Sequence, residues 1–318
     1  MPLNEIESQR VLGHKKIESI LANAIRSKRV FPTWIFSGPP GVGKSMMADK
    51  FARCLLSDTI PSGNFLDVPL QHPVHRLVDM RTHPDLFVLE NQADTVASID
   101  DTRQLMAKFR KKPTLSRWRV VLLKGAENLN KNIHNSLLKI LEEPPANSVI
   151  IMTCSHVGSM PKTLLSRSAR INFRPLETEL VQSYLEKIGT PNPGKLAKLS
   201  GGSIGYALQL QHNDGTAVRE MLEHIFQSDQ LDDVTCKNIG HLMDTYAATH
   251  FSIIKESILQ IMGSYVSMLV DKTPASTVLD IKILKIMDII SMLNKEQRFM
   301  LDRDVVLAYI FERFFSIP

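Results

Sequence analysis

The sequence predicts an α/β fold built on a doubly wound parallel sheet, followed by a small helical lid and an all-α C-terminal domain. In the first half of the chain, short apolar runs that are typical of strands alternate with helical patterns. A glycine-rich loop joins the first of these strands to a helix. After Arg174 and Pro175 no strand-like run remains, which predicts helices from there onward. We therefore expect domains at residues 1–175, 176–213 and 214–318.

Five short runs predict the strands of the sheet. Two of them, residues 120–123 and 149–153, are apolar throughout, which is typical of parallel strands buried on both faces. The others lie at residues 33–37, 85–90 and 171–173. Helical patterns occupy residues 14–28, 44–56, 99–111 and 130–142 among the strands, and 177–188, 195–211 and 216–315 after them. The proline-rich segment 57–84 predicts an excursion from the sheet.

Length and composition exclude several classes of protein. The chain has 318 residues, which suffices for about two domains of ~150 residues or three small ones. Its 43% hydrophobic and 22% charged residues are typical of a globular protein. Cys54, Cys154 and Cys236 lie far apart, which excludes a disulfide scaffold and indicates a reducing compartment. Without a secretory leader or an apolar run of ~18 residues, we expect a cytoplasmic protein with no membrane partner. A net charge of +5 permits a nucleic-acid partner.

The glycine-rich loop matches the phosphate-binding pattern G-x-x-x-x-G-K-[ST] between a strand and a helix. In this pattern, backbone N–H groups surround phosphate oxygens and the positive end of the following helix adds to them. The lysine would reach the β- and γ-phosphates, and the final hydroxyl would ligate Mg²⁺. The sequence thus permits ATP or ADP with Mg²⁺ as ligand. The candidate nucleotide-binding residues are Gly38, Pro39, Pro40, Gly41, Val42, Gly43, Lys44 and Ser45.

The acidic part of such a site is degenerate. A P-loop ATPase holds Mg²⁺ with a carboxylate at the tip of a neighbouring strand, the Walker B position. The strand at 120–123 ends instead in Lys124 and Gly125, and Glu127 is an alternative acidic residue beyond the strand end. The ammonium group of a lysine repels Mg²⁺. The repulsion is up to about 4 kcal/mol for each pair of unit charges ~4 Å apart in an effective dielectric of ~20. We predict weak or absent hydrolysis by this chain alone, and hypothesise that Lys124 makes a bound nucleotide less dependent on Mg²⁺.

Several strings resemble bacterial clamp-loader subunits of DNA polymerase III, which belong to the AAA+ class. They are VLGH at residues 11–14, SGPPGVGKS at 37–45, HPD at 83–85, NSLLKILEEPP at 135–145 and LSRS at 165–168. The last resembles the SRC motif of that family, with Ser168 in place of cysteine. The most specific run ends in Leu141, Glu142, Glu143, Pro144 and Pro145. The resemblance implies an AAA+ P-loop domain and covers essentially the whole chain.

Within that family, the choice lies between the gamma/tau motor subunit and the delta-prime subunit. Lys124 and Gly125 favour delta-prime, as does Gly205, which stands where a motor subunit carries its sensor-2 arginine. The end of the sequence at residue 318, where a tau-like extension would continue, is a further reason to expect delta-prime. The intact P-loop departs from the best-known delta-prime pattern. Motor subunits also carry a four-cysteine zinc module, of which only Cys54 remains here, so no zinc is expected.

The resemblance assigns Arg167 to the subunit edge that faces a neighbour's nucleotide. There a guanidinium acts as an arginine finger in trans, stabilising charge on the transferring phosphoryl group. This predicts a scaffold subunit that completes a neighbouring ATPase site during loading of a sliding clamp on primed DNA. The implied partners are the motor (gamma/tau) and delta subunits, with clamp and DNA reached through the complex. The alternative is a competent gamma/tau-like ATPase or another AAA+ remodeller.

Three further features remain open in the sequence. Sensor 1 is expected around Cys154 or Ser155, at the end of the fourth strand. Three histidines of the proline-rich segment, His72, His75 and His83, are interpreted as surface residues and not as metal ligands. A basic stretch either contacts DNA phosphates or is a solvated loop after a helix C-terminus. It comprises Arg103, Lys108, Arg110, Lys111, Lys112, Arg117 and Arg119.

Overall fold

The computed structural model describes residues 11–90, 107, 109, 111–129, 137–138, 140–155, 157–212, 214–228, 231–272, 283–293 and 302–316. Two compact units make up the chain, Met1–Val181 and Gln182–Pro318. The predicted helices at residues 99–111 and 130–142 fall largely outside the described residues.

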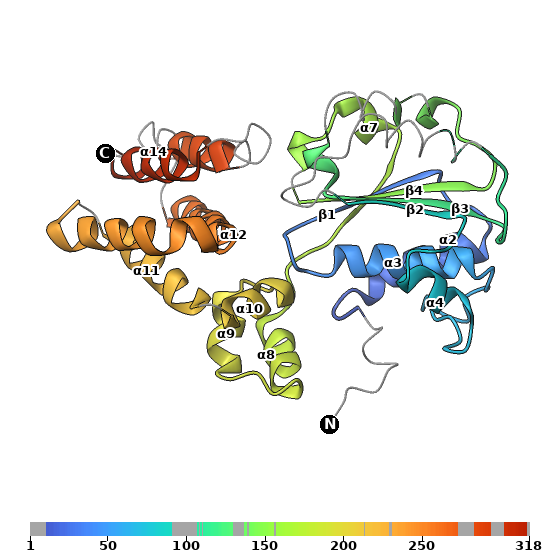
Figure 1. The fold of residues 1–318 in the computed structure, drawn as a ribbon, viewed down its shortest axis with the longest axis horizontal. Helices are drawn as coiled ribbons and strands as arrows, with labels where there is room; N and C mark the ends of the chain where they lie inside the picture. The colour runs from blue at the N-terminus through green and yellow to red at the C-terminus, as the bar shows by residue number, and fades with distance from the viewer. Residues whose placement is uncertain are drawn as a thin grey trace. The chain divides into compact units, whose positions relative to one another are not determined.

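The first unit is built on one parallel sheet, as the sequence predicts. The strands are β1 (Thr33–Ser37), β2 (Leu86–Glu90), β3 (Arg119–Lys124), β4 (Ser148–Cys154) and β5 (Ala169–Asn172). Their order is β2-β3-β4-β1-β5, and every neighbouring pair is parallel (Figure 1). The predicted strand at 171–173 was placed too late, because β5 begins at Ala169 and Phe173 follows it.

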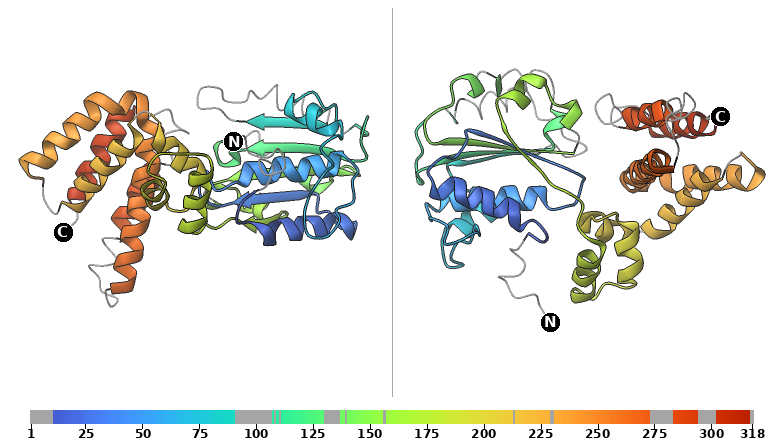
Figure 2. Two further views of the ribbon diagram at one scale, coloured as in Figure 1. Left: turned by 90° about the horizontal axis from the view of Figure 1, so that it is seen from below. Right: turned by 180° about the vertical axis from the view of Figure 1, so that it is seen from behind.

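Helices cover both faces of this sheet. Figures 1 and 2 show α2 (Lys15–Arg26), α3 (Lys44–Leu56) and α4 (Val74–Asp79) on one face and α7 (Lys162–Ser166) on the other. Successive strand residues point to opposite faces. In β1, Phe36 joins the apolar core beneath α2 and α3, while Ile35 joins the core that includes Leu164 of α7. Because all neighbouring strands are parallel, their carboxyl ends lie along one edge of the sheet. Ligands of open α/β folds bind at this edge.

The predicted excursion at 57–84 is folded against α2 and α3. Glu18 of α2 is buried, and its Oε1 accepts from Lys50 Nζ at 2.5 Å and from the Leu66 N–H at 2.9 Å. Lys50 also pairs with Asp67 at 3.0 Å. The short helix α4 lies inside this segment and is a feature that its prolines did not predict. One buried carboxylate thus ties the excursion to the sheet domain.

Among the described residues of the second unit, the regular secondary structure is helical throughout. The helices are α9 (Pro193–Leu199), α10 (Ile204–Gln211), α11 (Gly215–Gln227), α12 (Asp233–Lys272) and α14 (Arg303–Phe315), with residues 283–293 also helical. The preceding α8 (Thr178–Lys187) spans the division between the units. Helix α12 has non-helical backbone angles at His250. Within the described residues, none of the helices combines the length and the apolar character needed to cross a bilayer.

Candidate nucleotide site and arginine edge

The P-loop forms the turn between the carboxyl end of β1 and the start of α3. Gly38 has φ +144°, and a Cβ there would lie 2.2 Å from the Phe173 carbonyl oxygen. Gly43 precedes the helix with φ +105°. Both positions require glycine because an L side chain rarely adopts such angles. The glycines predicted from the sequence therefore have a clear backbone reason.

Lys44 is the first residue of α3 and is 7% exposed. Its ammonium donates to the carbonyl oxygens of Gly38 at 2.6 Å and Pro39 at 2.7 Å. The ammonium group thus contacts the first two residues of the loop through their neutral carbonyl groups. A phosphate oxygen is a stronger acceptor than a carbonyl, because it carries charge, so exchange of these partners for a nucleotide is chemically favourable.

His14 contacts the P-loop through Val42. The sequence identified this histidine only as part of the VLGH string and assigned it no role. Its Nε2 lies 2.8 Å from the Val42 carbonyl oxygen, and its ring meets Phe173 edge-on at 4.7 Å. Burial lowers the pKa of His14 below its ordinary value, although the Val42 carbonyl acts in the opposite direction. A neutral imidazole donating to Val42 fits this setting. The sequence signal for such a role was the histidine's place just before the first helix.

The degenerate Walker B position carries a lysine whose charge is compensated. Lys124 ends β3, and its Nζ lies 3.3 Å from Asp49 Oδ2 of α3 and 4.0 Å from Glu90 Oε1 of β2. Gly125 follows in the left-handed region at φ 68° and donates its N–H to Thr153 Oγ1 at 3.2 Å. The strand end therefore offers no carboxylate, and Lys124 is directed toward two acidic side chains.

Glu127 returns to this edge of the sheet through the short 3-10 helix Ala126–Asn128. Its Oε1 accepts from the Ser155 N–H at 2.7 Å. The backbone carbonyl of the preceding residue, Cys154, accepts from the Gly38 N–H at 3.2 Å. Burial raises the pKa of the Cys154 thiol to about 12, with Glu127 raising it further and Lys44 lowering it. The end of β4 thus lies between Glu127 and the P-loop.

Arg167 lies after α7 and before β5, with its side chain 44% exposed. Its guanidinium contacts the Thr163 carbonyl at 3.5 Å and lies 3.9 Å from Glu142 Oε1. Glu142 belongs to the LEEPP motif, so the structure brings two separate family motifs together. In the same motif Leu141 packs against the core, while Glu143 and Pro144 are exposed and Pro145 is half-buried.

Arg167 and the P-loop occupy opposite edges of the sheet. In the β1–β5 register, Ala169 pairs with Trp34, near the start of β1, whereas the P-loop follows Ser37 at its end. Three strand residues span about 10 Å, and Arg167 precedes Ala169 by two residues. Arg167 therefore lies near the amino end of β5, at the opposite end of the strands from the P-loop.

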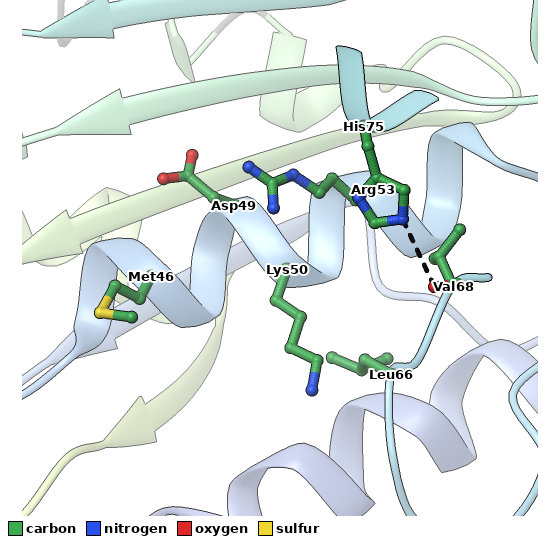
Figure 3. Close-up of a pocket in the computed structure, with 7 residues that line it drawn as sticks. All are labelled: Met46, Asp49, Lys50, Arg53, Leu66, Val68 and His75. Atoms are coloured by element: carbon green, nitrogen blue, oxygen red, sulfur yellow. Dashed lines mark hydrogen bonds between the residues drawn. The ribbon is translucent and has the colours of Figure 1, made fainter. Parts of the chain in front are cut away.

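A small pocket lies on the outer side of α3 (Figure 3). Figure 3 shows Asp49 and Lys50 leaving α3 on different sides, and His75 bonded to the Val68 carbonyl. The remaining lining residues are Met46, Arg53, Leu66 and Val68. None of the lining residues belongs to the P-loop, and Lys50 pairs with Glu18 and Asp67. This pocket is distinct from the nucleotide site.

The histidines of the excursion make separate local contacts. The N–H of Val74 donates to His72 Nδ1 at 3.2 Å, and that of Asp85 donates to His83 Nδ1 at 3.1 Å. His83 is buried, so its interpretation as a surface residue was wrong. Over the part of the chain that the structure describes, no group of three or more His, Cys, Asp or Glu residues is arranged to hold a metal.

The basic stretch does not form one surface. Arg119 is 4% exposed and pairs with the fully buried Asp85 at 3.3 Å. Lys111, Lys112 and Arg117 are exposed. Arg103, Lys108 and Arg110 lie outside the described residues. Arg119 is thus a structural residue, because burial and an ion pair remove it from any DNA surface.

A P-loop at the carboxyl edge of a parallel sheet, with a following helical unit, defines an α/β protein of the P-loop class. Residues 13–177, just over half the chain, match the family described as DNA polymerase III, delta subunit, and the chain belongs to this family. This confirms the AAA+ clamp-loader resemblance of the sequence and its fold class.

Sequences similar to this chain include subunits of DNA polymerase III. The chain is 28% identical to the DNA polymerase III subunit tau/gamma of Haemophilus influenzae, over 63% of this chain and 30% of the relative. It is 22% identical to subunit gamma of Buchnera aphidicola, over 82% of this chain and 70% of the relative. The chain spans less than a third of the length of such tau-type relatives, and it covers 27% of the DNA polymerase III subunit tau of Salmonella typhimurium. A gamma subunit-related protein of Thermotoga maritima aligns over 95% and 98% of the two chains, with 15% identity and a TM-score of 0.44.

Proposed function

We propose that this chain is a delta-prime type subunit of a DNA polymerase III clamp loader, and that it supplies Arg167 in trans to a neighbouring ATPase subunit. The observation that carries this proposal is the position of Arg167. It is partly exposed at the sheet edge opposite its own P-loop, and Glu142 is a weak, solvent-exposed partner. A guanidinium placed there is available to a second subunit and remote from its own nucleotide.

The proposal also gives the P-loop a role. Lys44 and the loop glycines have the arrangement that binds ATP or ADP, while Lys124 and Gly125 offer no strand-end carboxylate. The nucleotide is then bound by this subunit with little or no hydrolysis. The proposed partners are the motor (gamma/tau) and delta subunits, and through them the sliding clamp and primed DNA.

The proposal is tested by reconstituting the complex with wild type, Arg167→Ala and the control Arg174→Ala. Arg174 is also exposed and lies seven residues along the chain. Single-turnover ATP hydrolysis at the site that Arg167 completes should slow by about 10³–10⁵-fold in Arg167→Ala. Arg174→Ala should match wild type, and all three complexes should assemble. Unchanged hydrolysis and clamp loading in an assembled Arg167→Ala complex would refute the proposal.

A second candidate function is that of a competent gamma/tau-like ATPase, favoured by the well-formed P-loop. The two are separated by ATPase activity of the purified chain alone, with and without primed DNA. Brisk turnover that depends on Lys44 supports the ATPase, whereas background turnover supports the delta-prime assignment.

A further inference from the structure

Glu127 is a carboxylate beside the P-loop that the proposed function leaves without a role. Two hydrogen bonds fix the turn that carries it to the end of β4. They are the bond from the Gly125 N–H to Thr153 Oγ1 at 3.2 Å and that from the Ser155 N–H to Glu127 Oε1 at 2.7 Å. Because Gly38 bonds to the residue just before Ser155, Glu127 lies close to the first residue of the P-loop.

The second oxygen of this carboxylate is buried and unsatisfied. Glu127 Oε2 has no hydrogen-bond partner among the described residues, although Oε1 is bonded. A buried polar atom without a partner costs free energy, and native proteins keep one where a ligand, ion or water completes it. Glu127 raises the pKa of the Cys154 thiol and Lys44 lowers it, so the carboxylate and the P-loop cation both lie near this thiol.

Mg²⁺ fits this group chemically. It takes oxygen ligands in an octahedral shell, keeps several waters, and is usually bound through one or two carboxylates together with substrate phosphates. The candidate protein ligands are the Ser45 hydroxyl, which the P-loop pattern assigns to Mg²⁺, and Glu127 Oε2. The competing group, Lys124, is held by Asp49 and Glu90.

We propose that Glu127 replaces the missing strand-end carboxylate as the acidic group of this nucleotide site, binding the Mg²⁺ of a P-loop nucleotide directly or through a water of the ion. The proposal rests on the nucleotide-binding half of the proposed function and does not depend on Arg167. Gly125 still offers no side chain to orient an attacking water. In this proposal the Mg²⁺–nucleotide stays bound to the subunit and is not hydrolysed by it.

The test compares wild type with Glu127→Gln and with Glu312→Gln, an exposed carboxylate on α14. The amide of Gln keeps an oxygen acceptor for the Ser155 N–H, so the unliganded melting temperature should stay near that of wild type. ADP affinity of the full chain is measured calorimetrically in Mg²⁺ and in EDTA. Wild type and Glu312→Gln should bind ADP about 10–100-fold more tightly in Mg²⁺, and Glu127→Gln should lose most of that gain while keeping its EDTA affinity.

A second readout uses Mn²⁺ in place of Mg²⁺. Electron paramagnetic resonance should show protein-bound Mn²⁺ with ADP for wild type and Glu312→Gln, and a much weaker bound signal for Glu127→Gln. An equal Mg²⁺ gain in Glu127→Gln would overturn the proposal. So would equal wild-type affinity in Mg²⁺ and EDTA, which would favour the Lys124 hypothesis, or the absence of ADP binding. None of these outcomes bears on Arg167, whose test is hydrolysis by the assembled complex.

Discussion

Two arginine–carboxylate pairs lie along the same amino edge of the sheet and differ in almost every physical respect. Arg119 begins β3 and pairs with Asp85, with side chains 4% and 0% exposed. Arg167 precedes β5 and lies 3.9 Å from Glu142, with side chains 44% and 60% exposed. The first pair is enclosed by the domain, whereas the second faces solvent.

The difference separates a charge that stabilises the fold from one that we propose acts on a neighbouring subunit. Asp85 also accepts the backbone N–H groups of Thr114, Leu115 and Ser116, so it organises the loop that leads into β3. Arg119 has further contacts with the Lys112 carbonyl and the ring of Phe87. Arg167 has only its Thr163 carbonyl and distant Glu142 contacts in the described structure. An arginine that must reach another subunit's phosphate has to be held loosely, because strong local partners would compete with that phosphate.

Replacing Asp85 with alanine should give the largest effect. The change leaves a buried guanidinium and three backbone N–H groups without their acceptor, so the free energy of unfolding should fall by about 3–5 kcal/mol. Urea unfolding of the full chain measures it. The control is Asp58→Ala, which removes an exposed carboxylate that accepts the Arg117 N–H of the same loop and should cost about 0.5–1.5 kcal/mol. Equal losses of unfolding free energy in the two variants would show that burial of the carboxylate does not set the size of the effect.

Lowering the pH should remove the stabilisation that the buried pair provides. Burial by itself raises the pKa of Asp85, but the N–H groups of Ser116, Leu115 and Thr114 and the Arg119 guanidinium outweigh it and hold this pKa below its usual range. Asp85 therefore stabilises the fold above the unfolded pKa of about 3.9, and this stabilisation is lost as the pH falls through the folded pKa. Asp85→Asn should cost about 1–3 kcal/mol at neutral pH. The gap in unfolding midpoint between wild type and Asp85→Asn should begin to narrow below pH ~4 and should close once the pH lies below the folded pKa of Asp85. A constant gap would contradict this account.

Removing the exposed pair should have the smallest effect. Glu142→Gln eliminates a long ion pair in high-dielectric surroundings, so the free energy of unfolding should change by less than about 1 kcal/mol. Thermal and urea unfolding of the isolated chain provide the measurement. A loss as large as that of Asp85→Ala would mean that Glu142 fixes Arg167 as part of the fold, and the comparison would fail.

The sequence predicted the sheet well because its strands are local apolar runs with local boundaries. The helix after the P-loop begins and ends where expected, and β1 matches its predicted range. The basic stretch was predicted less well, since Arg119 differs from Arg117 only in what covers it. Its partner Asp85 lies 34 residues away, and no local pattern signals that pairing.

The sequence by itself determined that this protein carries the residue pattern of a phosphate-binding loop and lacks an acid at the end of the neighbouring strand. Both facts depend on residue order over a few positions, where backbone conformation and side-chain chemistry are locally encoded. Only the tertiary structure decided which carboxylates meet which partners: Glu127 reaches Ser155 across 28 positions, and Glu142 lies beside Arg167. Parallel strands bring such distant residues to a common edge, and that juxtaposition depends on the order and register of the whole sheet.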